Sequence, residues 1–234
     1  VFHEAAINDT ENLDEKEMMR ANVDSSIALF DYVLKNGCRK IVYATSTAVY
    51  GASPAPYVES KGVEPFNPYG ESKKIMEEKA QELNKKYPDA VMVGLRYCNV
   101  YGPGESHKGK RATMIYQLAQ QMRVKNPKLF KSGEQRRDYI YAKDVVTANM
   151  LALNAKESCI VNCGSGVPTS FNDLVKILNS VLGTDRVPEY IENTVARYQS
   201  YTECDMTLAK EKLGFVPEYD IEKGIRDYFA SGAL

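Results

Sequence analysis

The chain has 234 residues, of which 44% are hydrophobic, and a formal net charge of −1. That length allows one large domain or a domain with a smaller lobe, and the near-neutral charge gives no reason to expect nucleic acid or an anionic membrane as a partner. No apolar run approaches the roughly 20 residues that a membrane-spanning helix needs.

Cysteine and histidine usage argues against a metal centre. The five cysteines include no Cys-x-x-Cys pair, and the two histidines, His3 and His107, lie far apart. A zinc site of the usual spacing is therefore not expected, and we predict no metal. Free thiols are typical of a reducing compartment, which predicts a cytoplasmic protein.

The first hundred residues alternate between apolar runs and helical repeats. Short apolar runs at 1–6, 40–44 and 90–95 are typical of buried parallel strands. Between them, apolar residues recur every three or four positions at 19–34 and 69–83, as in amphipathic helices. This alternation predicts an α/β fold, with a doubly wound, Rossmann-like parallel sheet covered by helices.

The pattern loosens after Tyr101, and the second half indicates a smaller lobe of mixed α/β structure. Helices are predicted at 114–122, 144–155, 171–181, 206–213 and 221–229, and strands at 128–130, 137–141 and 159–162. No repeat, low-complexity tract or linker separates this half from the first.

The polar residues of interest follow the predicted strands. Ligands of parallel α/β sheets bind beyond the carboxyl ends of the strands. Those ends are Glu4–Ala6, Thr45–Ser46 and Tyr97–Asn99. We therefore expect a binding site along this edge of the sheet.

A tyrosine followed four residues later by a lysine places both side chains on one helix face. The nearby ammonium favours the phenolate, so such a tyrosine can take a hydroxyl proton while hydride leaves the carbon. The pattern occurs four times, at Tyr57, Tyr69, Tyr139 and Tyr219. Only Tyr69 opens a long predicted helix after a strand and a loop, so Tyr69 and Lys73 are the candidate pair.

Ser46 closes the second predicted strand and is a candidate partner of Tyr69. Its hydroxyl would hydrogen-bond the reacting oxygen and hold it near the tyrosine. A turn residue without a catalytic role is the simpler interpretation of Ser46 taken alone, and Thr45 and Thr47 are neighbouring alternatives.

Four segments resemble successive motifs of the extended short-chain dehydrogenase/reductase family, in that family's order and spacing. They are Val-Phe-His-Glu-Ala-Ala at 1–6, Tyr-Ala-Thr-Ser-Thr-Ala-Val-Tyr-Gly at 43–51, Pro-Tyr-Gly-Glu-Ser-Lys at 68–73 and Leu-Arg-Tyr-Cys-Asn-Val-Tyr-Gly-Pro at 95–103. The resemblance implies a nucleotide-sugar epimerase. It makes 1–104 the C-terminal portion of an NAD(P)-binding Rossmann domain. It makes 105–234 mainly a substrate-binding lobe, with some segments returning to the first domain.

The resemblance also implies site residues. Ser46, Tyr69 and Lys73 would form the catalytic set, and Asn22 would support the active site from within a helix. Cofactor contacts are expected from Glu4, Ala5, Ala6, Ile7, Asn8, Asn22, Lys73, Val100 and Lys108. The expected cofactor is NADP; NAD stays open, because the selecting residue follows an earlier strand of the complete fold.

The segment His107-Lys108-Gly109 makes the resemblance closest to the ADP-glyceromannoheptose 6-epimerases, enzymes of lipopolysaccharide heptose biosynthesis. In that subfamily a lysine at this position is thought to be a second acid/base, which makes Lys108 the fourth catalytic candidate. Epimerisation by transient oxidation removes hydride from one face and returns it to the other, so an acid/base on each side is useful. Phosphate binding or a solvated loop are the alternatives for Lys108.

Substrate contacts are implied in the second half. Arg137 would hold the diphosphate, since an arginine fork suits a phosphate. The other implied contacts are Asn99, Lys110, Gln117, Phe130 and Tyr198. Lys110 and Gln117 stand where the subfamily has Ser and His, which leaves the identity of the sugar open.

Three alternatives remain from the sequence. A UDP-sugar 4-epimerase and a 4,6-dehydratase belong to the same superfamily, although Thr47-Ala48 replaces the Asp-Glu pair typical of a dehydratase. A non-catalytic binding homologue or fragment is the third, because no Gly-rich phosphate-binding turn precedes Val1. We expect an N-terminal part of a longer enzyme to be missing, and a homo-oligomer as in related proteins.

Overall fold

The computed structural model describes residues 1–9, 14–193 and 199–234. They form two compact units, each made of several segments of the chain. The first unit comprises Val1–Cys98, Val146–Cys163 and Asp205–Val216. The second comprises Asn99–Val145, Gly164–Cys204 and Pro217–Leu234.

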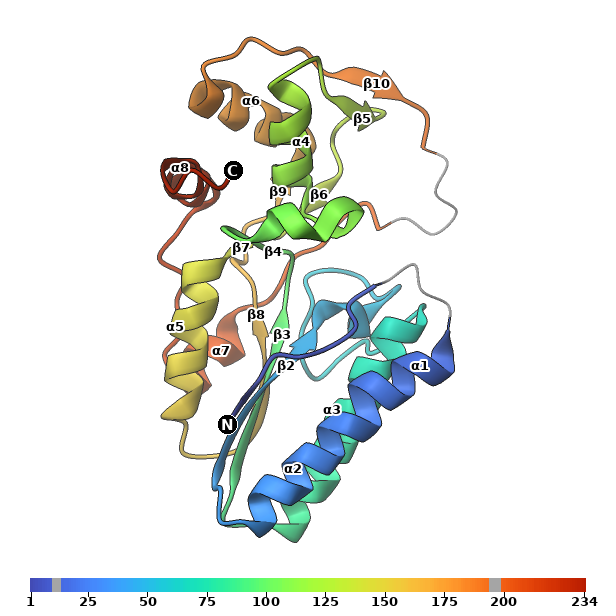
Figure 1. The fold of residues 1–234 in the computed structure, drawn as a ribbon, viewed down its shortest axis with the longest axis vertical. Coiled ribbons are helices and arrows are strands. Elements are labelled where there is room, and N and C mark those ends of the chain that lie inside the picture. Colours follow the sequence, from blue (N-terminus) through green and yellow to red (C-terminus); the bar gives the residue numbers. More distant parts are fainter. Residues whose placement is uncertain (10–13, 194–198) are drawn as a thin grey trace. The chain divides into compact units, whose positions relative to one another are not determined.

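A four-stranded parallel sheet in the order β1-β2-β3-β8 forms the centre of the first unit (Figure 1). The strands are β1 (Phe2–His3), β2 (Lys40–Ser46), β3 (Val91–Tyr97) and β8 (Cys159–Cys163). Ser46 pairs with Tyr97 and Tyr97 pairs with Cys163, so three carboxyl ends lie level at one edge. The predicted parallel Rossmann-like sheet is confirmed.

Helices cover both faces of this sheet (Figure 1). On one face lie α1 (Glu15–Met19), the π-helical turn η1 (Arg20–Asp24), α2 (Ser25–Lys35) and α3 (Pro68–Lys86). The other face carries α7 (Thr207–Leu213) and the part of α5 (Ala142–Leu153) that belongs to this unit. The core on the first face joins Phe30 of α2, Tyr43 of β2 and Met76 of α3.

The start of α3 is encoded locally. Asn67 is the N-cap, and its side-chain oxygen accepts a hydrogen bond from the Gly70 N–H at 2.8 Å. Pro68 occupies the first turn, where its missing N–H costs nothing. The helix therefore begins at the residue before Tyr69, and Tyr69 stands in its first turn.

Two elements differ from the prediction in the first unit. The strand predicted at 1–6 is confined to Phe2–His3, and the Asn22 side chain holds the following segment through the Ile7 backbone. The helix predicted at 19–34 contains the wide turn η1, which includes Asn22. Both deviations centre on one buried asparagine.

Among the described residues of the second unit, the strands form three two-stranded sheets. β4 (Val100–Tyr101) pairs with β7 (Ile140–Tyr141), β5 (Lys128–Phe130) with β10 (Glu189–Ile191), and β6 (Arg136–Arg137) with β9 (Thr169–Ser170). The single strand predicted at 137–141 is wrong, because Asp138 separates β6 from β7 and draws backbone N–H groups to its carboxylate.

Helices α4 (Met114–Met122), α6 (Phe171–Leu182) and α8 (Ile221–Ala230) pack on a core that includes Leu118, Leu174 and Ile225. Two short 3₁₀ segments, η2 (Thr47–Tyr50) and η3 (Glu105–Arg111), follow β2 and β4. In the described parts of the chain, no helix is long and apolar enough to cross a membrane.

Candidate active site

Ser46 and Tyr69 meet at the carboxyl edge of the first unit's sheet. Ser46 is the last residue of β2, and its Oγ accepts a hydrogen bond from the Ala48 N–H at 3.1 Å. Tyr69 stands in the first turn of α3 and is hydrogen-bonded through its side chain to Ser46. A strand end and a helix start thus bring two hydroxyl groups together.

Lys73 lies one helical turn after Tyr69 and is buried, with 2% of its surface exposed. Its Nζ lies 6.0 Å from the centroid of the Tyr69 ring and donates a hydrogen bond to the Ala44 carbonyl at 2.9 Å. The structure thus brings together the three residues Ser46, Tyr69 and Lys73, of which the last two were selected by sequence from four Tyr-x-x-x-Lys matches.

The protein environment shifts the pKa values of Tyr69 and Lys73 in opposite directions. Burial lowers the pKa of Lys73 to about 8, while the negative charges of Glu4 and Glu77 oppose that shift. Burial raises the pKa of Tyr69, and the hydrogen bond with Ser46 acts the other way. A buried lysine with a pKa of about 8, one helical turn from a phenol, suits proton exchange at slightly alkaline pH.

The pKa of Lys73 predicts how stability depends on pH. The folded value of about 8 lies below the 10.5 of an exposed lysine, so the unfolded chain binds more protons between those values. The contribution of Lys73 to the free energy of unfolding should therefore rise with pH from about 8, by at most about 1.4 kcal/mol per pH unit.

Urea unfolding of the wild type and of Lys73→Met, at several pH values from 7 to 10, measures this effect. The difference between the two proteins should grow in favour of the wild type as pH rises. Lys85→Met removes an exposed lysine from the same helix and should leave the wild-type slope unchanged. A difference that stays flat for Lys73→Met would contradict the assignment.

The segment after β1 is held by Asn22, which is fully buried. Its Oδ1 accepts from the Ile7 N–H at 2.8 Å, and its Nδ2 donates to the Ile7 carbonyl at 2.9 Å. Nδ2 also donates to Ser72 Oγ at 3.0 Å, on the helix that carries Tyr69. Asn22 therefore ties the candidate cofactor segment to α3, and its amide is engaged by protein atoms.

Within this segment, Glu4 interacts with Tyr97 and with the catalytic candidate Lys73. It is hydrogen-bonded to the Tyr97 side chain, and partial desolvation raises its pKa while Tyr97 and Lys73 oppose the shift. Of the candidate cofactor contacts in this segment, Ile7 is half-buried. The other four are exposed: Glu4, Ala5, Ala6 and Asn8.

The remaining predicted site residues lie in the second unit. Asn99 adopts a left-handed conformation with φ of 37° and donates from its side-chain amide to the Asp138 carbonyl at 2.7 Å. An asparagine tolerates this conformation better than most residues, because its short polar side chain bonds nearby backbone. Val100 follows in β4 and is half-buried.

Lys108 lies on a loop that is closed by a buried glutamate. Glu105 accepts hydrogen bonds from the Thr113 N–H at 2.8 Å and from the Thr113 hydroxyl at 3.1 Å. Lys108 Nζ lies 3.9 Å from Glu105 Oε1 and is one-third exposed. The Gln117 amide donates to the carbonyls of Lys110 and Ala112, so Gln117 shapes the same loop.

Arg137 is half-buried in β6, and its guanidinium carbon lies 5.7 Å from the centroid of the Phe171 ring. Phe130 ends β5 and is half-buried. Tyr198 falls outside the described residues. Arg137, Phe130, Asn99 and the Lys108 loop thus belong to one unit, and Ser46, Tyr69 and Lys73 belong to the other.

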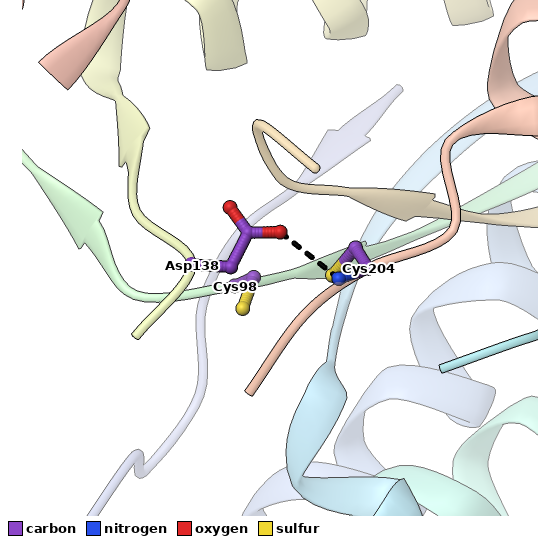
Figure 2. Close-up of side chains that lie close together, drawn as sticks. All are labelled: Cys98, Asp138 and Cys204. Atoms are coloured by element: carbon purple, nitrogen blue, oxygen red, sulfur yellow. Dashed lines mark hydrogen bonds between the residues drawn. The ribbon is translucent and has the colours of Figure 1, made fainter. Parts of the chain in front are cut away.

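Asp138 is fully buried next to Arg137, beside Cys204 (Figure 2). Its carboxylate accepts hydrogen bonds from the N–H groups of Ser165 at 2.7 Å, Gly166 at 3.0 Å and Cys204 at 3.0 Å. The Ser165 hydroxyl donates to it at 2.6 Å. Both oxygens are thus engaged by N–H and O–H donors, which accounts for the burial of this acid.

Sequence reasoning missed a buried ion pair beneath the catalytic candidates. Glu77 of α3 and Arg96 of β3 are 4% exposed each, and their charged groups approach to 2.7 Å. The sequence offered one signal of this pair, which is Arg96 itself. A charge directly after the apolar run 90–95 is expensive to bury unless it is paired.

Comparisons with known proteins give the family of the chain. A family model described as the NAD dependent epimerase/dehydratase family matches residues 1–164. Among solved structures, ADP-L-glycero-D-manno-heptose-6-epimerase of Helicobacter pylori is 38% identical with a TM-score of 0.90, and the match covers 100% of this chain and 72% of that one.

UDP-glucose 4-epimerase of Thermotoga maritima, solved with UDP-glucose, is 30% identical with a TM-score of 0.89, covering 100% of this chain and 78% of that one. MoeE5 in complex with UDP-glucose and NAD is 26% identical with a TM-score of 0.85, covering 100% and 80%. With most of its length matched and the fold shared throughout, the chain belongs to the NAD-dependent epimerase/dehydratase family.

Proposed function

We propose that the chain is a sugar-nucleotide 6-epimerase that works by transient oxidation, with an ADP-glyceromannoheptose as substrate. The observation that carries the proposal is the contact of Ser46 with Tyr69 above the buried Lys73. The choice of subfamily rests on the 38% identity to the Helicobacter pylori 6-epimerase and on the Lys108 loop.

The residues present fit a nicotinamide cofactor. Lys73 has three N–H donors, and among the residues that the structure describes its hydrogen-bond acceptor is the Ala44 carbonyl. A buried ammonium with donors to spare suits the hydroxyl groups of a ribose, and Glu4 is close enough to act on the charge of Lys73. When bound, the nicotinamide accepts a hydride from the sugar and returns it. NADP is our choice, with NAD as the alternative.

Tyr69 is the proposed acid/base of this chain. Its phenolate takes the proton of the sugar hydroxyl as the carbon is oxidised, and the ammonium of Lys73 stabilises the phenolate. The Ser46 hydroxyl hydrogen-bonds the same oxygen and holds it against Tyr69. When the hydride returns to the opposite face, the proton comes from the second acid/base, and exchange with solvent restores both groups, so no net proton is consumed.

Lys108 is proposed as the second acid/base, used when the keto-sugar presents its opposite face. Arg137 is proposed to bind the diphosphate, and Asn99, Lys110, Gln117, Phe130 and Tyr198 to contact the rest of the substrate. In the described geometry Gln117 acts on the loop backbone, so its proposed contribution is to the shape of the Lys108 loop. A cytoplasmic homo-oligomer remains our prediction.

An assay with ADP-L-glycero-D-manno-heptose and, separately, UDP-glucose tests the proposal. We expect inversion at C6 of the heptose, followed by NMR, and no deuterium at that carbon in D₂O, because hydride stays within the site. Conversion of UDP-glucose to its 4-epimer would replace the proposal with a 4-epimerase, and loss of water with a dehydratase. No conversion of either sugar would favour a catalytically inactive fragment or binding homologue.

Native mass spectrometry, with the small molecules identified after denaturation, tests the cofactor. We expect NADP to be released. Release of NAD would correct the proposed cofactor and leave the reaction type unchanged, whereas a protein that binds neither dinucleotide when they are added would favour a non-catalytic fragment or binding homologue.

A further inference from the structure

Beneath Tyr69 and Lys73, the same face of α3 carries a third ionisable residue. Tyr69, Lys73 and Glu77 follow at intervals of four residues, which places them along one side of the helix. Glu77 is buried, with 4% of its surface exposed, so its charge must be compensated by protein groups.

The carboxylate of Glu77 joins α3 to both central strands. Arg96 of β3 donates from Nε to Oε1 at 3.0 Å and from Nη2 to Oε2 at 2.7 Å. Thr45 of β2 donates from its hydroxyl to Oε1 at 2.6 Å. Thr45 precedes Ser46, and the pairing of β2 with β3 places Thr45 opposite Arg96. The pair therefore sets the position of α3 directly below the Ser46–Tyr69 contact.

Arg96 is itself held in place. Its Nη1 donates to the Tyr50 hydroxyl at 2.8 Å and to the Glu59 carbonyl at 3.2 Å. The Tyr50 hydroxyl donates to Asn162 Oδ1 at 2.7 Å, on β8. A buried ion pair seldom adds stability over an apolar pair of similar volume, because desolvation offsets the attraction. Positioning is therefore a better account of this network than stability.

The charges that face Lys73 give Glu77 a second effect. The ionisable neighbours of Lys73 on α3 are Tyr69 and Glu77. His3 of β1 and Glu4, which follows β1, also face Lys73. Arg96 of β3 pairs with Glu77. Glu4 and Glu77 are the anions that favour the ammonium form of Lys73 against burial. Loss of Glu77 removes one of these anions and leaves the positive charge of Arg96 without its partner.

We propose that Glu77 is a positioning residue of this active site, which fixes α3 to β2 and β3 through Arg96 and Thr45 and keeps Lys73 charged beside Tyr69. The inference rests on the proposed function and deepens it. Glu77 acts through Lys73 and Tyr69, and we propose no contact of Glu77 with substrate or cofactor.

The first test is Glu77→Gln, with Glu78→Gln as the matched control on an exposed position of the same helix. We expect kcat to fall by about 10- to 100-fold, the scale of a small misplacement of catalytic groups, with KM changed less than about threefold. Loss of the Lys73 charge should contribute to the alkaline limb of the kcat profile, and we expect this limb to move to lower pH. Wild-type kcat and an unmoved limb would overturn the proposal.

A double variant separates positioning from the cost of an unpaired arginine. Glu77→Gln with Arg96→Met removes both charges, keeps an acceptor for Thr45 and avoids a buried cation without a partner. We expect this protein to fold, and its kcat and alkaline limb to stay displaced from the wild type. Wild-type kcat and a wild-type alkaline limb in the double variant would mean that the single variant is impaired only by the unpaired charge of Arg96. That result would contradict the proposal.

Urea unfolding requires no enzymatic turnover, so it tests the role of Glu77 independently of the proposed reaction. The pH window in which Lys73 affects stability is obtained from urea unfolding with and without the Lys73→Met substitution. That window should move to lower pH in the Glu77→Gln, Arg96→Met background. An unmoved window overturns the role of Glu77 even in an active enzyme. A moved window in a protein without epimerase activity supports that role and rejects the proposed reaction.

Discussion

Replacement of Tyr69 by phenylalanine should lower kcat by about 10²- to 10⁴-fold, the range that a general acid–base group contributes. The substitution removes one hydroxyl and leaves the ring in the first turn of α3, so Lys73 Nζ keeps its position near the ring and its hydrogen bond to Ala44. Steady-state kinetics, with folding checked by circular dichroism and urea unfolding, measures the loss.

Tyr219→Phe is the matched control, because it is the same change in another Tyr-x-x-x-Lys match that lies in the second unit. It should retain turnover within about threefold of the wild type, as expected when no acid–base group is removed. If Tyr69→Phe also stays within that range while folded, Tyr69 is not the acid/base and the proposed mechanism fails.

The second large effect is expected at Lys108. Lys108→Met should lower kcat by about 10²-fold or more if the lysine exchanges a proton with the keto-sugar. The side chain is one-third exposed and lies 3.9 Å from Glu105, whose hydrogen bonds with Thr113 close the loop. Methionine is unbranched like lysine and leaves those hydrogen bonds in place.

Lys108→Arg distinguishes the two roles that the sequence leaves open. Arginine keeps the positive charge and is not deprotonated in proteins, so it can bind phosphate but cannot exchange a proton. An acid/base role predicts that Lys108→Arg is as slow as Lys108→Met, with a nearly normal KM. Recovery of kcat by arginine would make Lys108 a phosphate-binding residue, and wild-type kcat in Lys108→Met would make it a solvated loop residue.

The elements that carry local signals were predicted from the sequence. The N-cap Asn67, Pro68 in the first turn and the run of apolar residues define α3 without any distant contact. The same holds for β2, whose apolar run ends in Ser46. A strand end and a helix start are local features, so the candidate trio Ser46, Tyr69 and Lys73 could be selected before the structure was known.

The wrongly predicted elements share one feature. In each, a buried polar side chain forms hydrogen bonds with residues far away in the sequence. Asn22 bonds Ile7 and Ser72, and it lies in the π-helical turn η1 that interrupts the predicted helix. Asp138 bonds Ser165 and Cys204, and so divides a predicted strand in two. Periodicity reports which face of an element is apolar, and it says nothing about such pairings.

The sequence by itself determined the parallel α/β architecture, the strand ends at which polar residues collect and the helix that presents Tyr69 and Lys73, because apolar periodicity, caps and i, i+4 spacing act over one element. Only the tertiary structure decided which buried charges meet. Burial of Glu77 requires the arginine 19 residues later in the chain, and burial of Lys73 requires the Ala44 carbonyl 29 residues earlier. Those pairings follow from desolvation, which exists only once the sheet and helices have packed.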